Sequence, residues 1–154
     1  MGPVMSLGYL LTHSATILLR QSDQVLQERL GIGMSQFKIL MMLQQNPNVQ
    51  QRRLAESLGQ TEASISRQIK LLCEKNLLAI RVNPKSRREH ITVPTAKGMK
   101  MTDAAMEVLE QYHTPMLERL TEKQRQQMYE SLSSFHEYIC MSGKPFACDH
   151  PFDM

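Results

Sequence analysis

Apolar residues recur at helical spacing along most of this chain, which predicts a largely helical protein. The first such segment covers residues 6–30, and the polar Ser22 interrupts its spacing. Gly31 and Gly33 are expected to end it, because glycine readily takes the left-handed conformation found after helices. The apolar positions of this segment are Leu7, Leu11, Ala15, Leu18, Leu26 and Leu30.

A second helix is expected to start at Ser35, which can cap it, and to run to about Gln44. The sequence Asn46–Pro47–Asn48 then predicts a turn. The positions expected to face the interior are Phe37, Leu40, Met41 and Leu43.

Residues 50–76 predict two further helices joined by a tight turn. The first has one apolar face, made of Leu54, Ala55 and Leu58. Gly59 stands where a left-handed residue is needed to end it, and Thr61 can cap the next helix. Glu62 then lies in the first turn of the second helix, where a negative charge suits the helix dipole.

The second of these helices has one apolar and one polar face. Ile65, Ile69 and Leu72 repeat at i, i+4 and i+7. The polar face carries Gln60, Ser64, Arg67, Gln68 and Lys70. A helix-turn-helix places such a polar face in the DNA major groove, although many other soluble helices are equally amphipathic.

A short β-hairpin is expected to follow. Residues 77–82 are mostly apolar, Asn83–Pro84 signals a turn, residues 85–88 are basic, and residues 90–94 include β-branched side chains. Two helices followed by such a hairpin form a winged helix. The basic tip of a wing can reach phosphates or the minor groove beside the recognition helix.

The order and spacing of residues from Met34 to Gly98 resemble the MarR (multiple antibiotic resistance) family of bacterial regulators. The matching stretches are residues 34–37 (MSQF), 54–59 (LAESLG), 65–67 (ISR), 71–72 (LL), 75–78 (KNLL), 84–88 (PKSRR) and 95–98 (TAKG). The chain departs from the family pattern at Ser86, where an aspartate is usual, and at Pro94, where an aliphatic residue is usual.

The resemblance implies a homodimer whose terminal helices intertwine, with Arg67 anchoring the recognition helix on DNA. It also implies that a small ligand, a metal or an oxidant relieves repression by changing the separation of the two recognition helices. The ligand cavity is expected between the dimerisation helices and the DNA-binding module.

Two long helices are expected after the hairpin. Thr95 opens the first, and Pro115 is expected to end or kink it. Its apolar stripe is Met101, Ala105, Val108, Leu109 and Tyr112. Thr121 and Gln124 have capping-box spacing and open the last helix, whose stripe is Met128, Leu132, Phe135 and Ile139.

These terminal helices either cover the core of their own module or form a dimer. An operator with two half-sites calls for a two-fold protein, which favours the dimer. The tail after them is expected to be non-helical, and whether Phe146 and Phe152 dock it on the protein stays open.

The length of 154 residues suits a single domain. We expect residues 1–33 and 96–141 to be dimerisation helices, 34–95 the winged helix-turn-helix module, and 142–154 a tail. No signal peptide or membrane-length apolar run is present, so a cytoplasmic protein without a membrane partner is expected.

Residues 50–100 hold eleven Lys/Arg against four Asp/Glu, whereas the rest of the chain holds seven Lys/Arg against eleven Asp/Glu. A basic middle between acidic flanks is typical of a nucleic-acid-facing module.

Enzymatic function is not expected, and no catalytic residue or cofactor is predicted. The sequence lacks a glycine-rich phosphate loop and a nucleophile elbow, and its five histidines are scattered.

Its three cysteines are expected to be reduced thiols. Cys140 and Cys148 are the candidates for a redox switch, and with His136 and His150 for a metal site, but ordinary cysteines are the favoured reading because no CxxC motif is present.

The sequence thus predicts a mainly α protein with a small β-hairpin wing and long N- and C-terminal dimerisation helices. The predicted function is a homodimeric transcriptional regulator, a repressor, that binds a pseudo-palindromic double-stranded DNA operator and is released by a small-molecule, oxidant or metal signal. The alternative is a winged helix used for protein–protein contact. The predicted DNA-binding residues are Gln60, Thr61, Glu62, Ser64, Ser66, Arg67, Gln68, Lys70, Lys85, Arg87 and Arg88.

Overall fold

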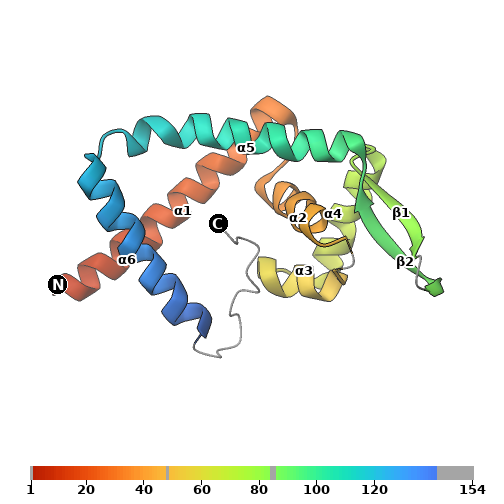
Figure 1. The fold of residues 1–154 in the computed structure, drawn as a ribbon, viewed down its shortest axis with the longest axis horizontal. Helices are drawn as coiled ribbons and strands as arrows, with labels where there is room; N and C mark the ends of the chain where they lie inside the picture. Colours follow the sequence, from red (N-terminus) through yellow and green to blue (C-terminus); the bar gives the residue numbers. More distant parts are fainter. Residues whose placement is uncertain (1, 48, 84–85, 142–154) are drawn as a thin grey trace.

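The fold is that of a computed structural model, which describes residues 2–47, 49–83 and 86–141 (Figure 1). Within these residues the chain forms helices and one antiparallel hairpin, as the sequence predicts. In chain order the elements are α1 (Pro3–Leu30), α2 (Met34–Gln45), α3 (Gln51–Leu58), α4 (Glu62–Glu74), β1 (Leu78–Asn83), β2 (Ser86–Pro94), α5 (Ala96–Leu117) and α6 (Glu122–Met141).

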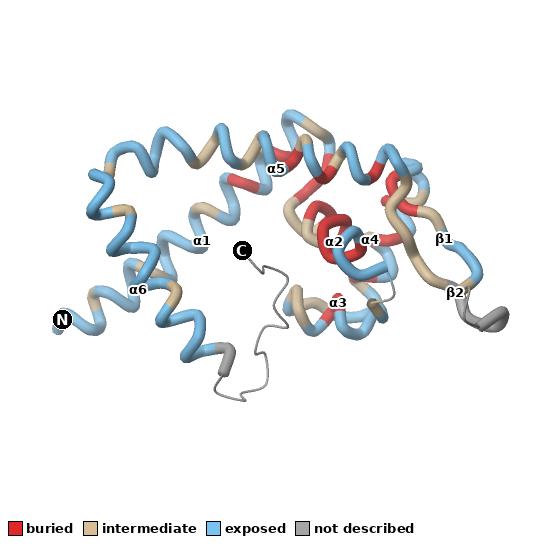
Figure 2. The backbone as a smooth tube through the Cα atoms, in the orientation of Figure 1, coloured by how far each residue is buried: buried red, intermediate tan, exposed pale blue. Residues whose placement is uncertain are grey.

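Helix α2 lies at the centre of the hydrophobic core. It packs against α1, α3, α4, α5 and β2, and its Phe37, Leu40, Met41 and Leu43 are buried as predicted. Buried positions gather on α2, on α4 and on the parts of α1 and α5 beside them (Figure 2). The core therefore belongs to the helix-turn-helix module, while the far parts of α1, α5 and α6 extend away from it as arms (Figure 1).

Helix α1 is one continuous helix, as predicted, and the polar Ser22 that breaks its apolar spacing lies within it. Ser22 is buried, and its hydroxyl forms a hydrogen bond of 3.0 Å with Nε2 of His113 on α5. This contact satisfies a polar group that burial would otherwise penalise. The helix begins at Pro3, before the predicted start, because proline suits the first helical position.

The hairpin has a longer second strand than predicted. β2 begins at Ser86 rather than at residue 90, and it pairs with β1 from Asn83↔Ser86 to Leu78↔Pro94. The register is irregular between Val82 and Asn83. Pro94 is the last residue of its strand, a position that proline tolerates, and the hairpin forms despite this departure from the family pattern.

Helix α5 continues beyond Pro115 and ends at Leu117, so proline does not itself end the helix. At Pro115 the missing N–H affects only the last turn. The predicted capping box is confirmed: the Thr121 N–H donates to Gln124 Oε1 (2.9 Å), and the Gln124 N–H donates to Thr121 Oγ1 (3.3 Å).

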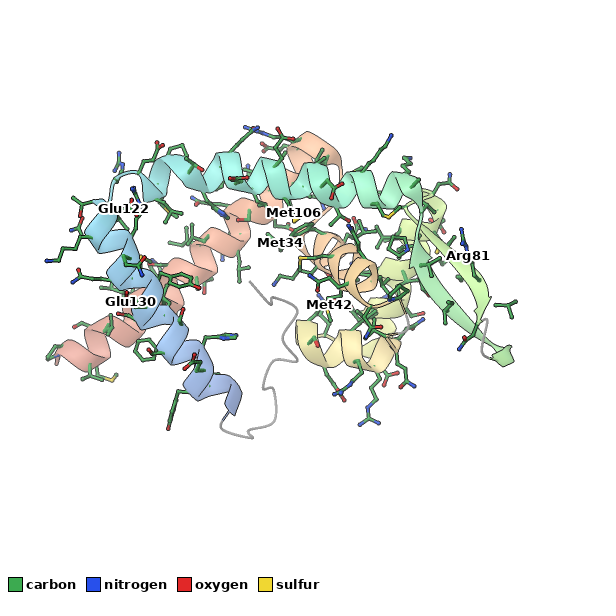
Figure 3. The ribbon with its side chains drawn as sticks, in the orientation of Figure 1. Met34, Met42, Arg81, Met106, Glu122 and Glu130 are labelled. Atoms are coloured by element: carbon green, nitrogen blue, oxygen red, sulfur yellow. The ribbon has the colours of Figure 1, made fainter. Side chains whose placement is uncertain are left out.

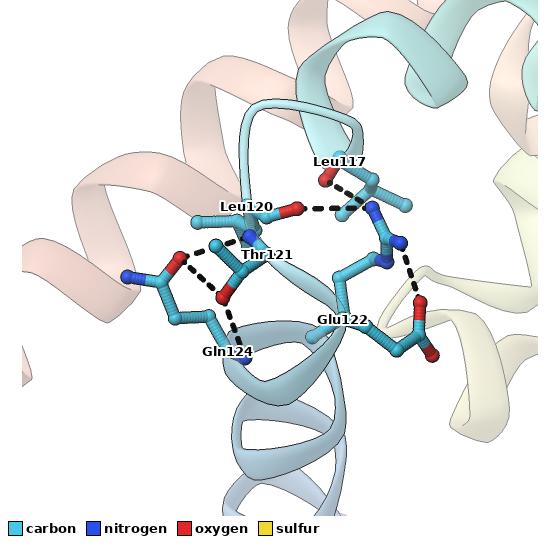
Figure 4. A network of polar contacts seen from close by, with 6 residues as sticks. Leu117, Leu120, Thr121, Glu122 and Gln124 are labelled. Carbon is cyan, nitrogen blue, oxygen red and sulfur yellow. Dashed lines mark hydrogen bonds and ion pairs between the residues drawn. The ribbon is translucent and has the colours of Figure 1, made fainter.

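The turn between α5 and α6 is closed by Arg125 (Figure 4). Its guanidinium donates to the carbonyls of Leu117 (3.4 Å) and Leu120 (3.0 Å) and pairs with Glu122. These contacts give hydrogen-bond donors to the carbonyl of the last residue of α5 and to a carbonyl of the turn that follows it. Among the described residues, none of the helices combines the length and apolar content that a bilayer span requires.

Candidate nucleic-acid interface

Helix α4 is anchored by one face and exposes the other. Ile65, Ile69 and Leu72 are buried in the core, as predicted. Thr61 caps the helix by accepting a hydrogen bond of 3.2 Å from the Ser64 N–H, which is also as predicted. The predicted DNA-binding positions that are exposed here are Thr61, Glu62, Ser66, Arg67 and Lys70. A rigid helix with an outward polar and cationic face is suited to contact DNA.

Three of the predicted DNA-facing side chains are only half-exposed: Gln60, Ser64 and Gln68. Gln60 Nε2 donates to Ser35 Oγ on α2 (2.8 Å), and Ser64 Oγ donates to Gln60 Oε1 (3.0 Å). These two bonds hold the start of α4 against the start of α2. Gln60 and Ser64 therefore have a structural role that sequence reasoning missed.

Both α4 and the hairpin carry exposed cations. Arg67 and Lys70 are exposed on α4. Arg81 is exposed on β1 (Figure 3). Arg52 and Arg53 on α3 instead form exposed ion pairs with Glu56, at 3.0 and 3.8 Å, which contribute little to stability.

The rest of the predicted wing contact lies beyond what the structure describes. Lys85 is outside the described residues, and so are the side chains of Arg87 and Arg88. Their part in the interface stays a prediction.

The segments after α4 and at the start of α5, which include the matching stretches 75–78 and 95–98, form a close junction. Asn76 takes the left-handed conformation (φ 58°) after α4, and the Leu77 N–H then donates to the Leu72 carbonyl (2.9 Å). Gly98 in the first turn of α5 lies against Leu77, where an added Cβ would be 2.0 Å from the Leu77 carbonyl oxygen. Only glycine fits there without movement of the backbone.

Cys73 is half-buried near the end of α4. Burial raises the pKa of its thiol, and the neighbouring Glu74 raises that pKa further. The thiol is therefore a weak nucleophile at neutral pH. The side chain of Cys140 and all of Cys148 lie outside the described part. Within the described part, no group of three or more His, Cys, Asp or Glu could hold a metal ion.

A pocket of about 630 Å³ lies between α1 and the C-terminal half of α5. Its lining is Leu18, Gln21, Tyr112, His113, Pro115, Met116 and Arg119. The resemblance led us to expect a ligand cavity between the dimerisation helices and the DNA-binding module, whereas these residues come from α1, α5 and the turn that follows α5.

The MarR family sequence profile matches residues 30–89 of the chain. None of the curated proteins matches it. A MarR family transcriptional regulator from Rhodococcus sp. RHA1 has a TM-score of 0.70 and 20% identity, covering 88% of this chain and 96% of that one.

Two further solved structures share the fold. A Mycobacterium tuberculosis MarR family protein in complex with salicylic acid has a TM-score of 0.71 and 26% identity, covering 84% of this chain and 95% of that one. The S. aureus MepR protein, in a DNA complex, has a TM-score of 0.64 and 23% identity, covering 82% and 93%. Residues 30–89 thus match the MarR family in sequence, and the chain shares its fold with transcriptional regulators of that family.

Proposed function

We propose that this chain is a homodimeric repressor that binds a pseudo-palindromic DNA operator in the bacterial cytoplasm. The observation that carries the proposal is the geometry of α4, whose apolar face is buried while Arg67 and Lys70 point outward beside the hairpin. The shared fold with a protein solved in a DNA complex supports it.

Within this proposal, the start and outer face of α4 read the major groove. The residues assigned to reading are Gln60, Thr61, Glu62, Ser64, Ser66, Arg67, Gln68 and Lys70. Gln60 and Ser64 are half-exposed and already bond to each other and, through Gln60, to Ser35. Lys85, Arg87 and Arg88 are assigned to phosphates or the minor groove. Phosphate contacts position the protein, whereas base contacts give it sequence preference.

The dimer is supported by the apolar surface of the arms. On α6, Leu132, Phe135 and Ile139 are 40%, 46% and 57% exposed. Leu7 and Leu10 on α1 are 50% and 57% exposed. In the described part of the chain, α6 packs extensively against no other element. Exposed apolar stripes of this kind are typical of interaction sites, and a second copy of the chain would cover them.

An effector is proposed for the pocket between α1 and α5. Arg119 offers a positive charge at its rim, and Leu18, Tyr112 and Met116 offer apolar walls. This composition suits a small organic anion, and salicylic acid is bound by the similar M. tuberculosis protein. Binding between the arms would change the separation of the two recognition helices and release the operator.

The proposal is tested by measuring DNA binding across salt concentrations. The DNA is the promoter upstream of the chain's own gene, and a scrambled duplex is the reference. The logarithm of the affinity should fall with the logarithm of salt by about 0.9 per phosphate contact. Arg87→Ala with Arg88→Ala should flatten this slope and weaken binding to both duplexes.

Lys123→Ala on α6 is the control, because it removes one exposed cation far from the module. If the salt dependence of affinity is unchanged in the Arg87→Ala, Arg88→Ala variant, the wing does not contact the DNA phosphates. No preference for the promoter at any salt concentration would instead favour a winged helix used for protein–protein contact.

A further inference from the structure

Two lysines of the basic segment bind backbone carbonyls at the ends of other helices. Lys97 Nζ donates to the carbonyl of Lys75 (3.0 Å), the C-cap residue of α4. Lys75 Nζ in turn donates to the carbonyl of Gly31 (2.6 Å), the C-cap residue of α1. Each ammonium group thus lies at the negative end of a helix dipole.

The position of Lys97 is otherwise unfavourable. It lies in the first turn of α5, where the helix dipole is positive and a cation is destabilising. The contact with the end of α4 offsets this, because the same ammonium meets the negative end of a second helix. Lys97 therefore stabilises the junction between α4 and α5 rather than α5 itself.

Neighbouring bonds complete the junction. Thr95 Oγ1 donates to the Asn76 carbonyl (2.7 Å), and the Thr95 N–H donates to the Leu77 carbonyl (3.0 Å). Three successive carbonyls after α4, those of residues 75, 76 and 77, thus accept hydrogen bonds from residues 95 and 97. The end of the recognition helix is fastened to the start of α5 and, through Lys75, to the end of α1.

We propose that Lys75 and Lys97 are positioning residues that fix the recognition helix to the dimerisation arms, rather than cations that contact DNA. The proposal rests on the DNA-binding function proposed above. A dimer must place two recognition helices in two half-sites at once. A loosened α4 lowers the fraction of molecules in the binding geometry, and the apparent dissociation constant equals the intrinsic constant divided by that fraction.

The test is Lys97→Met, which keeps an unbranched stem and removes the ammonium group. Lys100→Met is the matched control, since it removes the same charge from an exposed position of the same helix. We expect Lys97→Met to weaken operator binding by about two- to fivefold, the range for one cation at a helix end, with an unchanged salt slope. Lys97→Arg, which keeps a donor, should restore affinity.

Amide hydrogen exchange without DNA gives a second measurement. Exchange at Asn76, Leu77 and Thr95 should be faster in Lys97→Met than in the parent, and equal to the parent in Lys100→Met. Loss of about 0.9 from the salt slope in Lys97→Met would make Lys97 a phosphate contact and overturn the proposal. Parent-like exchange in that variant would overturn it too. A parent protein that binds no operator would refute the proposed function, while the exchange measurement would still decide the role of Lys97.

Discussion

At position 98 the chain has room for a hydrogen atom and nothing larger. A methyl group there would meet the Leu77 carbonyl oxygen, which is backbone and cannot rotate away. We expect Gly98→Ala to destabilise the protein by about 1–3 kcal/mol, the usual cost of overpacking. Thermal unfolding at matched protein concentration measures this, with a midpoint expected to fall by roughly 2–4 °C per kcal/mol.

Gly8→Ala is the control for this substitution. Gly8 lies inside α1, and a Cβ added there meets nothing within 4 Å. The same chemical change should therefore stabilise α1 by about 0.5–1 kcal/mol, because alanine is the better helix former. Equal stability of Gly98→Ala and the parent would show that the backbone at the α4–α5 junction shifts at little cost to make room for a methyl group.

The cysteines differ in their expected reactivity. Cys73 is half-buried with a raised thiol pKa, so a mild oxidant should leave it unmodified. Any thiol switch must then use Cys140 and Cys148. Operator affinity after oxidation is to be compared in the parent and in the Cys140→Ser, Cys148→Ser double variant. Loss of binding in the parent alone would support a switch, and an equal response in both would exclude one through these two residues.

At the scale of single elements, the recognition helix carries two kinds of residue: some are expected to contact DNA, and others hold the turn before the helix. Arg67 is exposed, whereas Ser64 is half-exposed and bonds to Gln60. Arg67→Ala should weaken operator binding by about 1–3 kcal/mol, with thermal stability unchanged. Ser64→Ala should lower the unfolding midpoint as well. Binding of every operator variant with parental affinity by both variants would exclude helix α4 as the reading helix.

The sequence predicted elements well where one face is buried. Ile65, Ile69 and Leu72 mark α4 because a core-facing stripe must repeat at helical spacing. It gave no partner for the polar Ser22 within α1, because His113, which forms a hydrogen bond with it, lies far along the chain on α5. It also missed the early start of β2 at Ser86, since that strand begins in residues too polar and basic to show an apolar pattern.

The sequence predicted which residue types form the candidate site, but not the hydrogen-bond partners of their side chains. Lys75 and Lys97 count in the charge balance like any other cation, and only the fold shows that each meets a carbonyl at the end of another helix. Gln60 was assigned to base reading from its place on a polar face, and the fold gives it Ser35 as a partner. Such contacts between distant residues leave no periodic signal in a single sequence.

At the scale of the whole molecule, the middle of the chain and its two ends are built differently. The helix-turn-helix module has a buried core, whereas α6 and the first half of α1 are mostly exposed (Figure 2). Their apolar side chains would face water in a lone chain, at a cost of about 1.5–3 kcal/mol for each large one that could be buried. The closed turn at Arg125 holds α6 at a defined angle to α5, so the arm is presented in a set orientation.

The dimer prediction follows from this exposed stripe. Leu132→Glu with Phe135→Glu keeps good helix formers on α6 but places charges where a partner chain is expected to pack. We expect a monomer or an unfolded chain, measured by light scattering and circular dichroism, and loss of operator binding at concentrations where the parent binds. Gln127→Glu, at an exposed polar position of α6, should stay dimeric. A folded double variant that remains a dimer would show that the α6 stripe lies outside the interface, and would leave α1 and α5 as the surfaces that join the two copies.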